Sequence, residues 1–222
     1  MGRVIVVQYI TLDGVVEDPD GSDGTPFGGW AMRYGPEGVA GDKFRLGGML
    51  ETGVLLFGRR TWDHFAELWP TRETSFARAM NQADKAVVTS RPLPESEWTN
   101  SRAVDGPLVE WIFQTVVTQD VVVIGSGSVV HVLREHDLVD EYRLIAFPTA
   151  VTAGRRLFRD PVDLELVSSE MTGPASLTVH RVSGHTADRV RRRCPGGARR
   201  GRTRTRRRRR RRAGTHPRAP CG

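Results

Sequence analysis

The stretch LFGRRTW at residues 56–62 decides how this sequence is expected to fold. Val54–Phe57 is a short apolar run that leads up to the glycine, and its length and composition predict a buried strand. After Gly58 the pattern changes, because apolar residues recur at helical spacing over residues 62–69. A buried strand that turns at a glycine into an amphipathic helix is typical of sheets that carry helices on their faces.

The same alternation of strand and helix signals recurs along the first 182 residues. Further buried strands are predicted at Val4–Tyr9, Lys85–Thr89, Val121–Ile124 and Glu141–Phe147. Helices are predicted over residues 37–51, 75–83, 108–118 and from 127 to about 135. A last pair of strands, 164–169 and 177–182, flanks a Thr-Gly-Pro-Ala turn. These signals predict an α/β sandwich with a mostly parallel central sheet and a C-terminal antiparallel hairpin.

Residues 17–38 fit neither pattern, because they combine six glycines and five acidic residues with scattered aromatic residues. The segment is too long and irregular for a simple connection between two elements. Segments of this kind are usually either functional lids or disordered, and the sequence leaves both alternatives open.

The charge of the chain is unevenly distributed. The 222 residues have a formal net charge of +7, but residues 183–222 alone hold 16 arginines and a single acid, Asp188. Residues 1–182 therefore carry a net charge of −8. We predict two parts, a folded domain over residues 1–182 and a disordered arginine-rich tail over residues 183–222.

The distribution of cysteine and apolar residues excludes several classes of protein. Both cysteines, Cys194 and Cys221, lie in the tail, so the folded part has no disulfide scaffold, cysteine-ligated zinc site or cysteine nucleophile. The histidines show no useful metal-ligand spacing, so no metal is expected. The longest apolar runs are far too short to span a bilayer, and the N-terminus leads directly into a strand. We therefore expect a cytoplasmic protein without a membrane partner.

Ligands of parallel sheets bind beyond the carboxyl ends of the strands, and three of these ends suit phosphate. Gly58 lets the backbone approach closely where a helix offers free N–H groups, with Arg59 beside it. Hydroxyl groups and a guanidinium follow the next strand at residues 89–91. Residues 125–128 open another helix. Each feature alone is more often simple turn geometry or a solvated arginine, but three in one small domain favour an anionic ligand.

Six short motifs follow one another along the first 158 residues, and their order and spacing carry more information than any one of them. They are Leu12-Asp13-Gly14, the stretch at 56–62, Val-Thr-Ser-Arg at 88–91, Val-Ile-Gly-Ser-Gly at 123–127, Leu-Val-Asp-Glu-Tyr-Arg at 138–143 and Gly-Arg-Arg-Leu-Phe at 154–158. As an ordered set they resemble the dihydrofolate-reductase-like superfamily over about residues 3–182. The closer resemblance is to the reductase domain of bacterial riboflavin-biosynthesis deaminase–reductases and its stand-alone relatives. It implies a three-layer dihydrofolate-reductase-like sandwich and a homodimer.

The resemblance also implies an activity, in which NADPH transfers a hydride to a pyrimidine- or pterin-type heterocycle. The corresponding step of riboflavin biosynthesis reduces 5-amino-6-(5-phosphoribosylamino)uracil. The implied cofactor-binding residues are Thr11, Gly14, Gly58, Arg59, Thr61, Ser90, Arg91, Gly125, Ser126, Gly127 and Ser128. Among them, Ser90 and Arg91 would contact the adenosine 2′-phosphate. No deaminase zinc motif is present, so only the reduction step is expected.

Two acids are candidates for the catalytic chemistry. Asp42 stands sixteen positions before Gly58, the spacing of the acid in dihydrofolate reductases, on the apolar face of the helix predicted over 37–51. An acid desolvated there would have a raised pKa and suit proton transfer, although chance placement competes with this interpretation. Asp13 would border the nicotinamide and the substrate. No residue stands out as an anchor for a substrate phosphate, because Arg33 and Lys43 are both more simply interpreted as solvated.

The tail offers a different function. Arg206–Arg212 is an unbroken run, and an arginine-rich arm would bind nucleic acid through the phosphates. The competing explanation, which we favour, is that the composition of the tail comes from GC-rich DNA that was translated past the end of its natural reading frame or outside that frame. The alternatives to a reductase are therefore a protein that binds nucleic acid through its tail, or a domain that binds a nucleotide without turning over any substrate.

Overall fold

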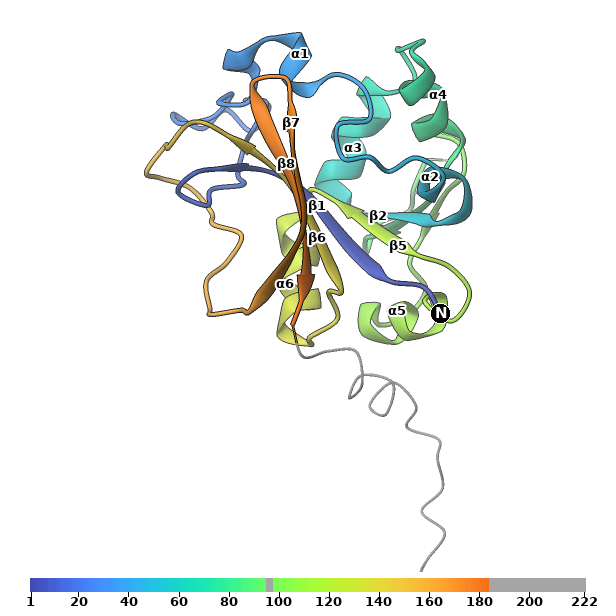
Figure 1. Ribbon diagram of the computed structural model, residues 1–222. Helices are drawn as coiled ribbons and strands as arrows, with labels where there is room; N and C mark the ends of the chain where they lie inside the picture. Colours follow the sequence, from blue (N-terminus) through green and yellow to red (C-terminus); the bar gives the residue numbers. More distant parts are fainter. Residues whose placement is uncertain (95–97, 184–222) are drawn as a thin grey trace, which may run out of the picture.

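The computed structural model describes residues 1–94 and 98–183, and within them one mixed sheet forms the centre of the domain (Figure 1). Its eight strands lie in the order β4-β3-β2-β5-β1-β6-β8-β7. They are β1 (Val4–Thr11), β2 (Val54–Gly58), β3 (Asp84–Val88), β4 (Ser101–Ala103), β5 (Val121–Ile124), β6 (Glu141–Phe147), β7 (Leu164–Thr172) and β8 (Ala175–Val182). Strands β1 to β6 are parallel, and the hairpin β7–β8 joins β6 in antiparallel pairing. The predicted fold class is confirmed.

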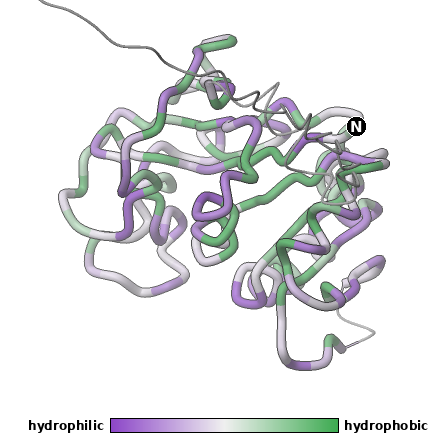
Figure 2. The backbone as a smooth tube through the Cα atoms, turned by 90° about the horizontal axis from the view of Figure 1, so that it is seen from below, coloured by the Kyte–Doolittle hydropathy of each residue, from purple (hydrophilic) through white to green (hydrophobic). Residues whose placement is uncertain are grey.

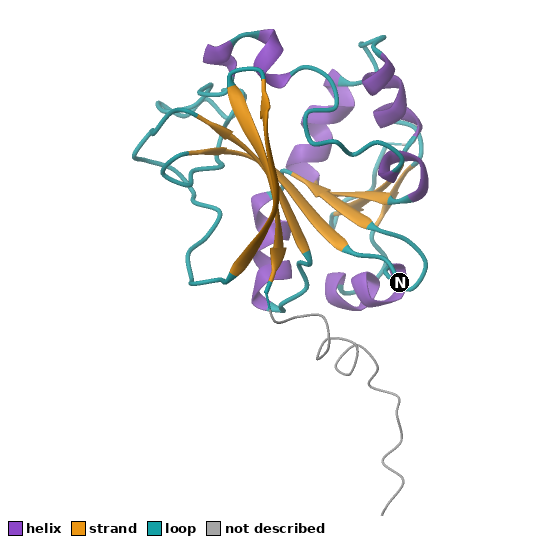
Figure 3. Cartoon of the chain, in the orientation of Figure 1, coloured by secondary structure: helices purple, strands orange, loops and turns teal. Residues whose placement is uncertain are grey.

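Helices cover both faces of this sheet, which makes three layers (Figure 3). The helices are α1 (Pro36–Val39), α2 (Met49–Thr52), α3 (Arg59–Leu68), α4 (Ser75–Gln82), α5 (Leu108–Thr115) and α6 (Gly127–Glu135), with a 3-10 helix, η1, at Met32–Tyr34. Helices α5 and α6 pack against one face, whereas α3, α4 and residues 30–50 pack against the other.

Strand β1 shows why the sheet is buried on both faces. Val4 and Val6 point into the core beneath α5 and α6, and Ile5 and Val7 point into the core beneath α3. All four are fully buried, as expected for a central strand of a covered parallel sheet. Figure 2 shows hydrophobic stretches through the middle of the molecule and hydrophilic residues on the surrounding loops.

The helix predicted over residues 37–51 is wrong. Only α1 and α2, of four residues each, form at its two ends, and the chain turns between them. Arg45 and Gly47 have positive φ angles of 53° and 47°, which a helix does not allow. The carboxylate of Asp42 accepts hydrogen bonds from the N–H groups of Leu46 and Gly47 at 2.7 and 2.8 Å. These local bonds offer the backbone an alternative to helix, so Asp42 holds a turn and does not face the core from a helix.

One further difference concerns a short segment at the sheet edge. Strand β4 was not predicted, because three residues at the sheet edge are too few to give a periodic signal. The predicted tail lies almost wholly outside the described residues. In the part of the chain that the structure describes, no helix has the length and apolar character needed to cross a bilayer.

Candidate functional site

A pocket of about 470 Å³ lies at the carboxyl ends of β2 and β5 and follows α3 along its length. One end is formed by the turns at Gly58 and at 125–128, together with the first residues of α3. The other end is lined by apolar residues from the last turn of α3 and from α4. Since α3 has ten residues and a helix rises 1.5 Å per residue, the two ends are about 15 Å apart.

The turn end presents the N-termini of two helices. Gly58 is the N-cap of α3 and Ser126 is the N-cap of α6, and no side chain in the described part of the chain caps either helix. Ser126 adopts the left-handed region with φ 56°, and its Oγ accepts a hydrogen bond from the Gly58 N–H at 2.7 Å. This bond ties the two turns together. Uncapped helix N-termini leave backbone N–H groups free and attract anions.

Glycine is favoured at Gly125, which has a φ of 62° and where a Cβ would lie 3.3 Å from the Thr61 side chain on α3. At Gly127 the backbone does not need glycine, but a Cβ would lie 2.9 Å from a guanidinium nitrogen of Arg155, which would have to move. The predicted residues Gly58, Thr61 and Gly125–Ser128 are therefore brought together at the turn end, and all of them line the pocket.

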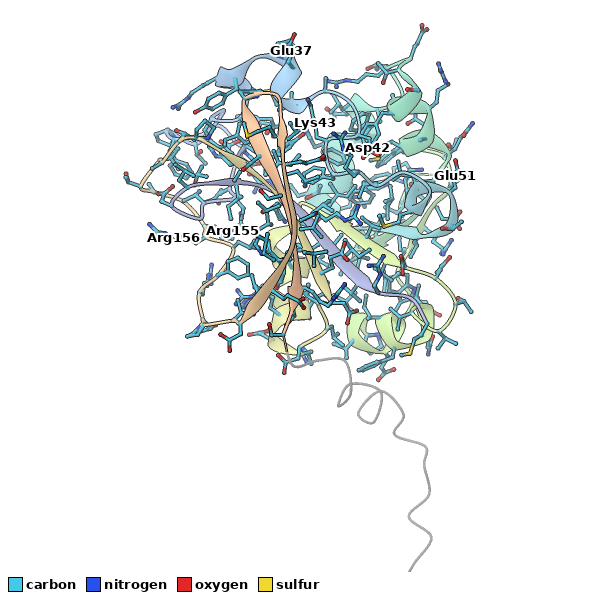
Figure 4. All side chains as sticks on the ribbon, viewed as in Figure 1. Glu37, Asp42, Lys43, Glu51, Arg155 and Arg156 are labelled. Atoms are coloured by element: carbon cyan, nitrogen blue, oxygen red, sulfur yellow. The ribbon has the colours of Figure 1, made fainter. Side chains whose placement is uncertain are left out.

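Arg155 is a pocket residue that sequence reasoning missed. Its guanidinium lies against Gly127 at the N-terminus of α6 and pairs with Glu17 at 3.0 Å. Its backbone N–H also donates to the Glu17 carboxylate, at 2.8 Å. The sequence does carry a signal, because Arg155 lies in the Gly-Arg-Arg-Leu-Phe motif at 154–158, but nothing in the motif tells which arginine faces inward. Figure 4 shows Arg155 and Arg156 on one side of the β7–β8 hairpin and Asp42 and Lys43 on the other.

Arg59 lies at the turn end but is already engaged. Its Nε contacts Asp63 at 2.6 Å, and its Nη1 donates to the Pro92 carbonyl at 3.0 Å. It thereby fixes the turn that carries Ser90 and Arg91 beside the start of α3. Ser90 and Arg91 themselves are exposed and do not line the pocket, so the structure places them at its margin.

The segment 17–38 forms an ordered wall of the pocket. Asp18 organises it, because its buried carboxylate accepts hydrogen bonds from the N–H groups of Asp23 and Thr25 and from the Thr25 hydroxyl. Burial acts to raise the pKa of Asp18, but these hydrogen bonds outweigh it and lower the pKa below its usual value. Trp30 is fully buried and donates from Nε1 to the Glu17 carbonyl at 2.9 Å. The segment thus has a defined conformation in the structure, and its role as a lid stays a prediction.

Polar contacts join this wall to α3. Asp23 contacts Arg60 at 2.6 Å, and Asp20 contacts Nε2 of His64 at 2.8 Å. Together with the pair between Glu17 and Arg155, these contacts place carboxylates of the 17–23 segment opposite the basic residues of the pocket.

The predicted residues Thr11, Asp13 and Gly14 lie outside the pocket lining. The Thr11 hydroxyl donates to Asp13 at 2.6 Å, and the Asp13 carboxylate also accepts from the backbone N–H of Thr152 at 2.8 Å. The hydrogen bond from Thr11 is the main cause that lowers the pKa of Asp13. An ionised carboxylate that anchors a loop is poorly suited to donate a proton.

Asp42 does not line the pocket either, although Gly41 and Phe44 on either side of it do. Tyr9 does line the pocket, and its hydroxyl donates to the Val39 carbonyl at 3.2 Å. Burial raises the pKa of Tyr9 to about 12, so its hydroxyl keeps its proton at any working pH. Its ring stacks on Phe44 with centroids 5.2 Å apart. Sequence reasoning did not single out Tyr9, because it lies in a strand that was interpreted only as core.

An α/β sandwich with paired helix ends beside an apolar pocket suits a ligand that has both an anionic part and an apolar part. The family model for the RibD C-terminal domain matches residues 3–178, so the chain belongs to that family and carries a riboflavin-biosynthesis reductase-like domain. The resemblance inferred from the motifs is confirmed. A comparison with curated proteins finds no significant match.

Solved structures share the fold. A candidate riboflavin biosynthesis protein from Shewanella sp. PV-4 superposes with a TM-score of 0.61 at 19% identity, over 81% of this chain and 98% of that chain. RibD from Acinetobacter baumannii gives 0.54 at 14% identity, over 82% and 58%. A pyrimidine reductase-like protein from Corynebacterium diphtheriae gives 0.52 at 11% identity, over 82% and 92%. The chain thus spans just over half the length of the Acinetobacter protein.

Proposed function

We propose that this protein is an NADPH-dependent reductase that transfers a hydride to a pyrimidine- or pterin-type heterocycle. The observation that carries the proposal is the pair of uncapped helix N-termini, tied by the hydrogen bond from Gly58 to Ser126, at one end of a pocket whose other end is apolar. A dinucleotide cofactor has the matching chemistry, with a charged diphosphate and flat rings.

The residues present fit such a cofactor. The free N–H groups at the starts of α3 and α6 would hold the diphosphate, and Arg155 would pair with it across Gly127. Ser90 and Arg91, at the margin, would contact a 2′-phosphate. When bound, the nicotinamide supplies the hydride, and the chain supplies orientation and a pocket wall that excludes water.

The other functions draw less support. No structural observation favours nucleic-acid binding, because the tail lies almost wholly outside the described residues. A nucleotide-binding domain without turnover would have the same helix ends, and only assays of turnover separate it from a reductase. A homodimer and a cytoplasmic location stay predictions.

The specificity for NADPH is tested by Arg91→Ala. We expect the Kd for NADPH to rise about tenfold and the Kd for NADH to change less than about twofold, because only NADPH carries the 2′-phosphate that Arg91 would contact. The measurement is a titration of nicotinamide fluorescence with the full-length chain. Arg159→Ala, another exposed arginine outside the pocket lining, is the control. Equal weakening of both cofactors, or binding of neither, would remove the basis of the proposal.

A further inference from the structure

Resting on the proposed function, we infer that His64 is the general acid of the reduction and that its Nδ1 gives the proton that accompanies the hydride. His64 lies on α3 and lines the pocket. Asp20, in the wall formed by the 17–38 segment, orients its ring. The two acids predicted from the sequence, Asp42 and Asp13, leave this role open because neither lines the pocket.

His64 lies midway along the pocket. Thr61, His64 and Leu68 follow one another at helical spacing on α3, and all three line the pocket. Thr61 is at the turn end, and Leu68 is at the apolar end. His64 is the sixth residue of α3, so it lies about 8 Å along the helix from Arg59. A cofactor held by its diphosphate at the turn end and a heterocycle at the apolar end would therefore meet beside His64.

Asp20 fixes the orientation of the imidazole ring. Its carboxylate lies 2.8 Å from Nε2 of His64, which is a hydrogen-bond distance. Nδ1 of His64 has no hydrogen-bond partner among the described residues, so it is the nitrogen left for a ligand. A carboxylate that holds one ring nitrogen determines which nitrogen faces the reacting group. The His64 side chain is 35% exposed, so water can return the proton after each turnover.

Other groups of the lining are poorly suited to giving and recovering a proton. Arginine keeps its proton at any working pH, and so does the Tyr9 hydroxyl, because burial raises the pKa of Tyr9 to about 12. Burial acts to raise the pKa of Asp18, but its hydrogen bonds outweigh burial and lower the pKa below its usual value. The remaining carboxylates of the lining contact basic side chains, and they are Glu17, Asp20 and Asp23.

Histidine is the side chain that exchanges its proton near neutral pH, and His64 is the one histidine among the described residues that line the pocket. Where the substrate presents a carbon–nitrogen double bond, its carbon takes the hydride of the dinucleotide as a new C–H bond. The π electrons move to the nitrogen, which takes the proton from Nδ1 as a new N–H bond. The substrate gains the two electrons that NADPH loses, and imidazolium becomes imidazole until water returns the proton.

A loss of turnover without a loss of cofactor binding is the expected signature. The probes are 5-amino-6-(5-phosphoribosylamino)uracil and 7,8-dihydrofolate, each reduced by the full-length chain with NADPH. We expect His64→Ala to lower kcat about a hundredfold, and added imidazole to raise the kcat of this variant about tenfold. The Kd for NADPH, measured by nicotinamide fluorescence, should stay within about twofold, because a general acid acts in the transition state.

Two further variants separate a chemical role of His64 from a structural one. His64→Gln keeps an N–H group that can donate to Asp20 but has no proton to give. It should lose kcat as His64→Ala does and should not respond to imidazole. His131→Ala is the matched control, because His131 also contacts a carboxylate, that of Glu135 at 3.3 Å, but does not line the pocket. It should change kcat by less than about twofold.

Chemical modification gives a readout that does not depend on turnover. Diethyl pyrocarbonate acylates histidine, and mass spectrometry follows His64 and His131 separately in the same natural chain. Each probe, added together with NADP⁺, should slow the acylation of His64 severalfold, because a ligand at Nδ1 covers the nitrogen that reacts. The acylation of His131 should not change.

The outcomes distinguish the inference from the proposed function. If a probe is reduced and His64→Ala keeps the natural kcat, or if a bound probe leaves His64 unprotected, the inference is overturned and the proposed function stands. If His64→Gln is as active as the natural chain, His64 has a structural role and the inference is equally overturned. If NADPH does not bind, or if neither probe is reduced, the proposed function fails and the inference fails with it.

Discussion

Replacing Lys85 with methionine is expected to lower the free energy of unfolding by about 3 kcal/mol. Lys85 is fully buried at the start of β3, and its Nζ donates to the carbonyls of Asn81, Ala83 and Thr99 at 2.9, 2.6 and 3.0 Å. It also lies 4.6 Å from the Trp98 ring. Methionine fills much of the same volume but removes all three hydrogen bonds, including the one to the carbonyl of the buried Ala83. The measurement is urea unfolding followed by tryptophan fluorescence.

Lys43→Met is the matched control, because the chain has only these two lysines and Lys43 is half-buried in a turn. We expect it to change stability by less than about 0.5 kcal/mol. A Lys85→Met variant as stable as the natural chain would show that removal of the buried charge offsets the lost hydrogen bonds.

The same residue predicts a pH dependence. Burial lowers the pKa of Lys85 from 10.5 to about 8. Between these two values the unfolded chain binds a proton that the folded chain does not, so the contribution of Lys85 to stability rises with pH. The rise is at most about 1.4 kcal/mol per pH unit. The stability difference between the natural chain and Lys85→Met should therefore grow from pH 8 to pH 9.5, and a constant difference would contradict the lowered pKa.

Replacing Arg155 with alanine is expected to raise the Kd for NADPH about thirtyfold, because a charge-assisted contact to the diphosphate is worth roughly 2 kcal/mol. The variant also removes the ion pair with Glu17, whereas the hydrogen bond from the backbone N–H of residue 155 to the Glu17 carboxylate is kept. The measurement is the fluorescence titration used for Arg91, at two salt concentrations. The loss should shrink at the higher one, since salt screens the contact.

Arg156→Ala is the control for this experiment. Arg156 is the next residue, is exposed, lies 3.9 Å from Asp13 and does not line the pocket. It should change the Kd for NADPH by less than about twofold. Equal losses in the two variants would mean that general charge, not the position of Arg155 over Gly127, governs cofactor binding.

Strands and strand-to-helix turns were the predictable part of this molecule. The run at Val121–Ile124 is apolar on both faces because the strand is covered on both, and that pattern is local. The turn at Gly58 was predictable for the same reason, because its glycine and the helical spacing after it are neighbours in sequence. The predicted phosphate-binding turns at Gly58 and Gly125 therefore lie together in one pocket.

The parts that were not predictable depend on distant partners or on competition between local bonds. Arg155 reaches its place through Glu17, 138 residues earlier in the chain. The apolar spacing around Asp42 suggested a helix, but the carboxylate binds the next turn's N–H groups and the glycines favour a bend.

The hydrogen bond from the Gly58 N–H to the Ser126 hydroxyl joins two turns that lie 68 residues apart in the sequence. The starts of α3 and α6 are therefore coupled through one side chain. A substitution that removes this hydroxyl would leave the Gly58 N–H without this acceptor and would act on both turns at once.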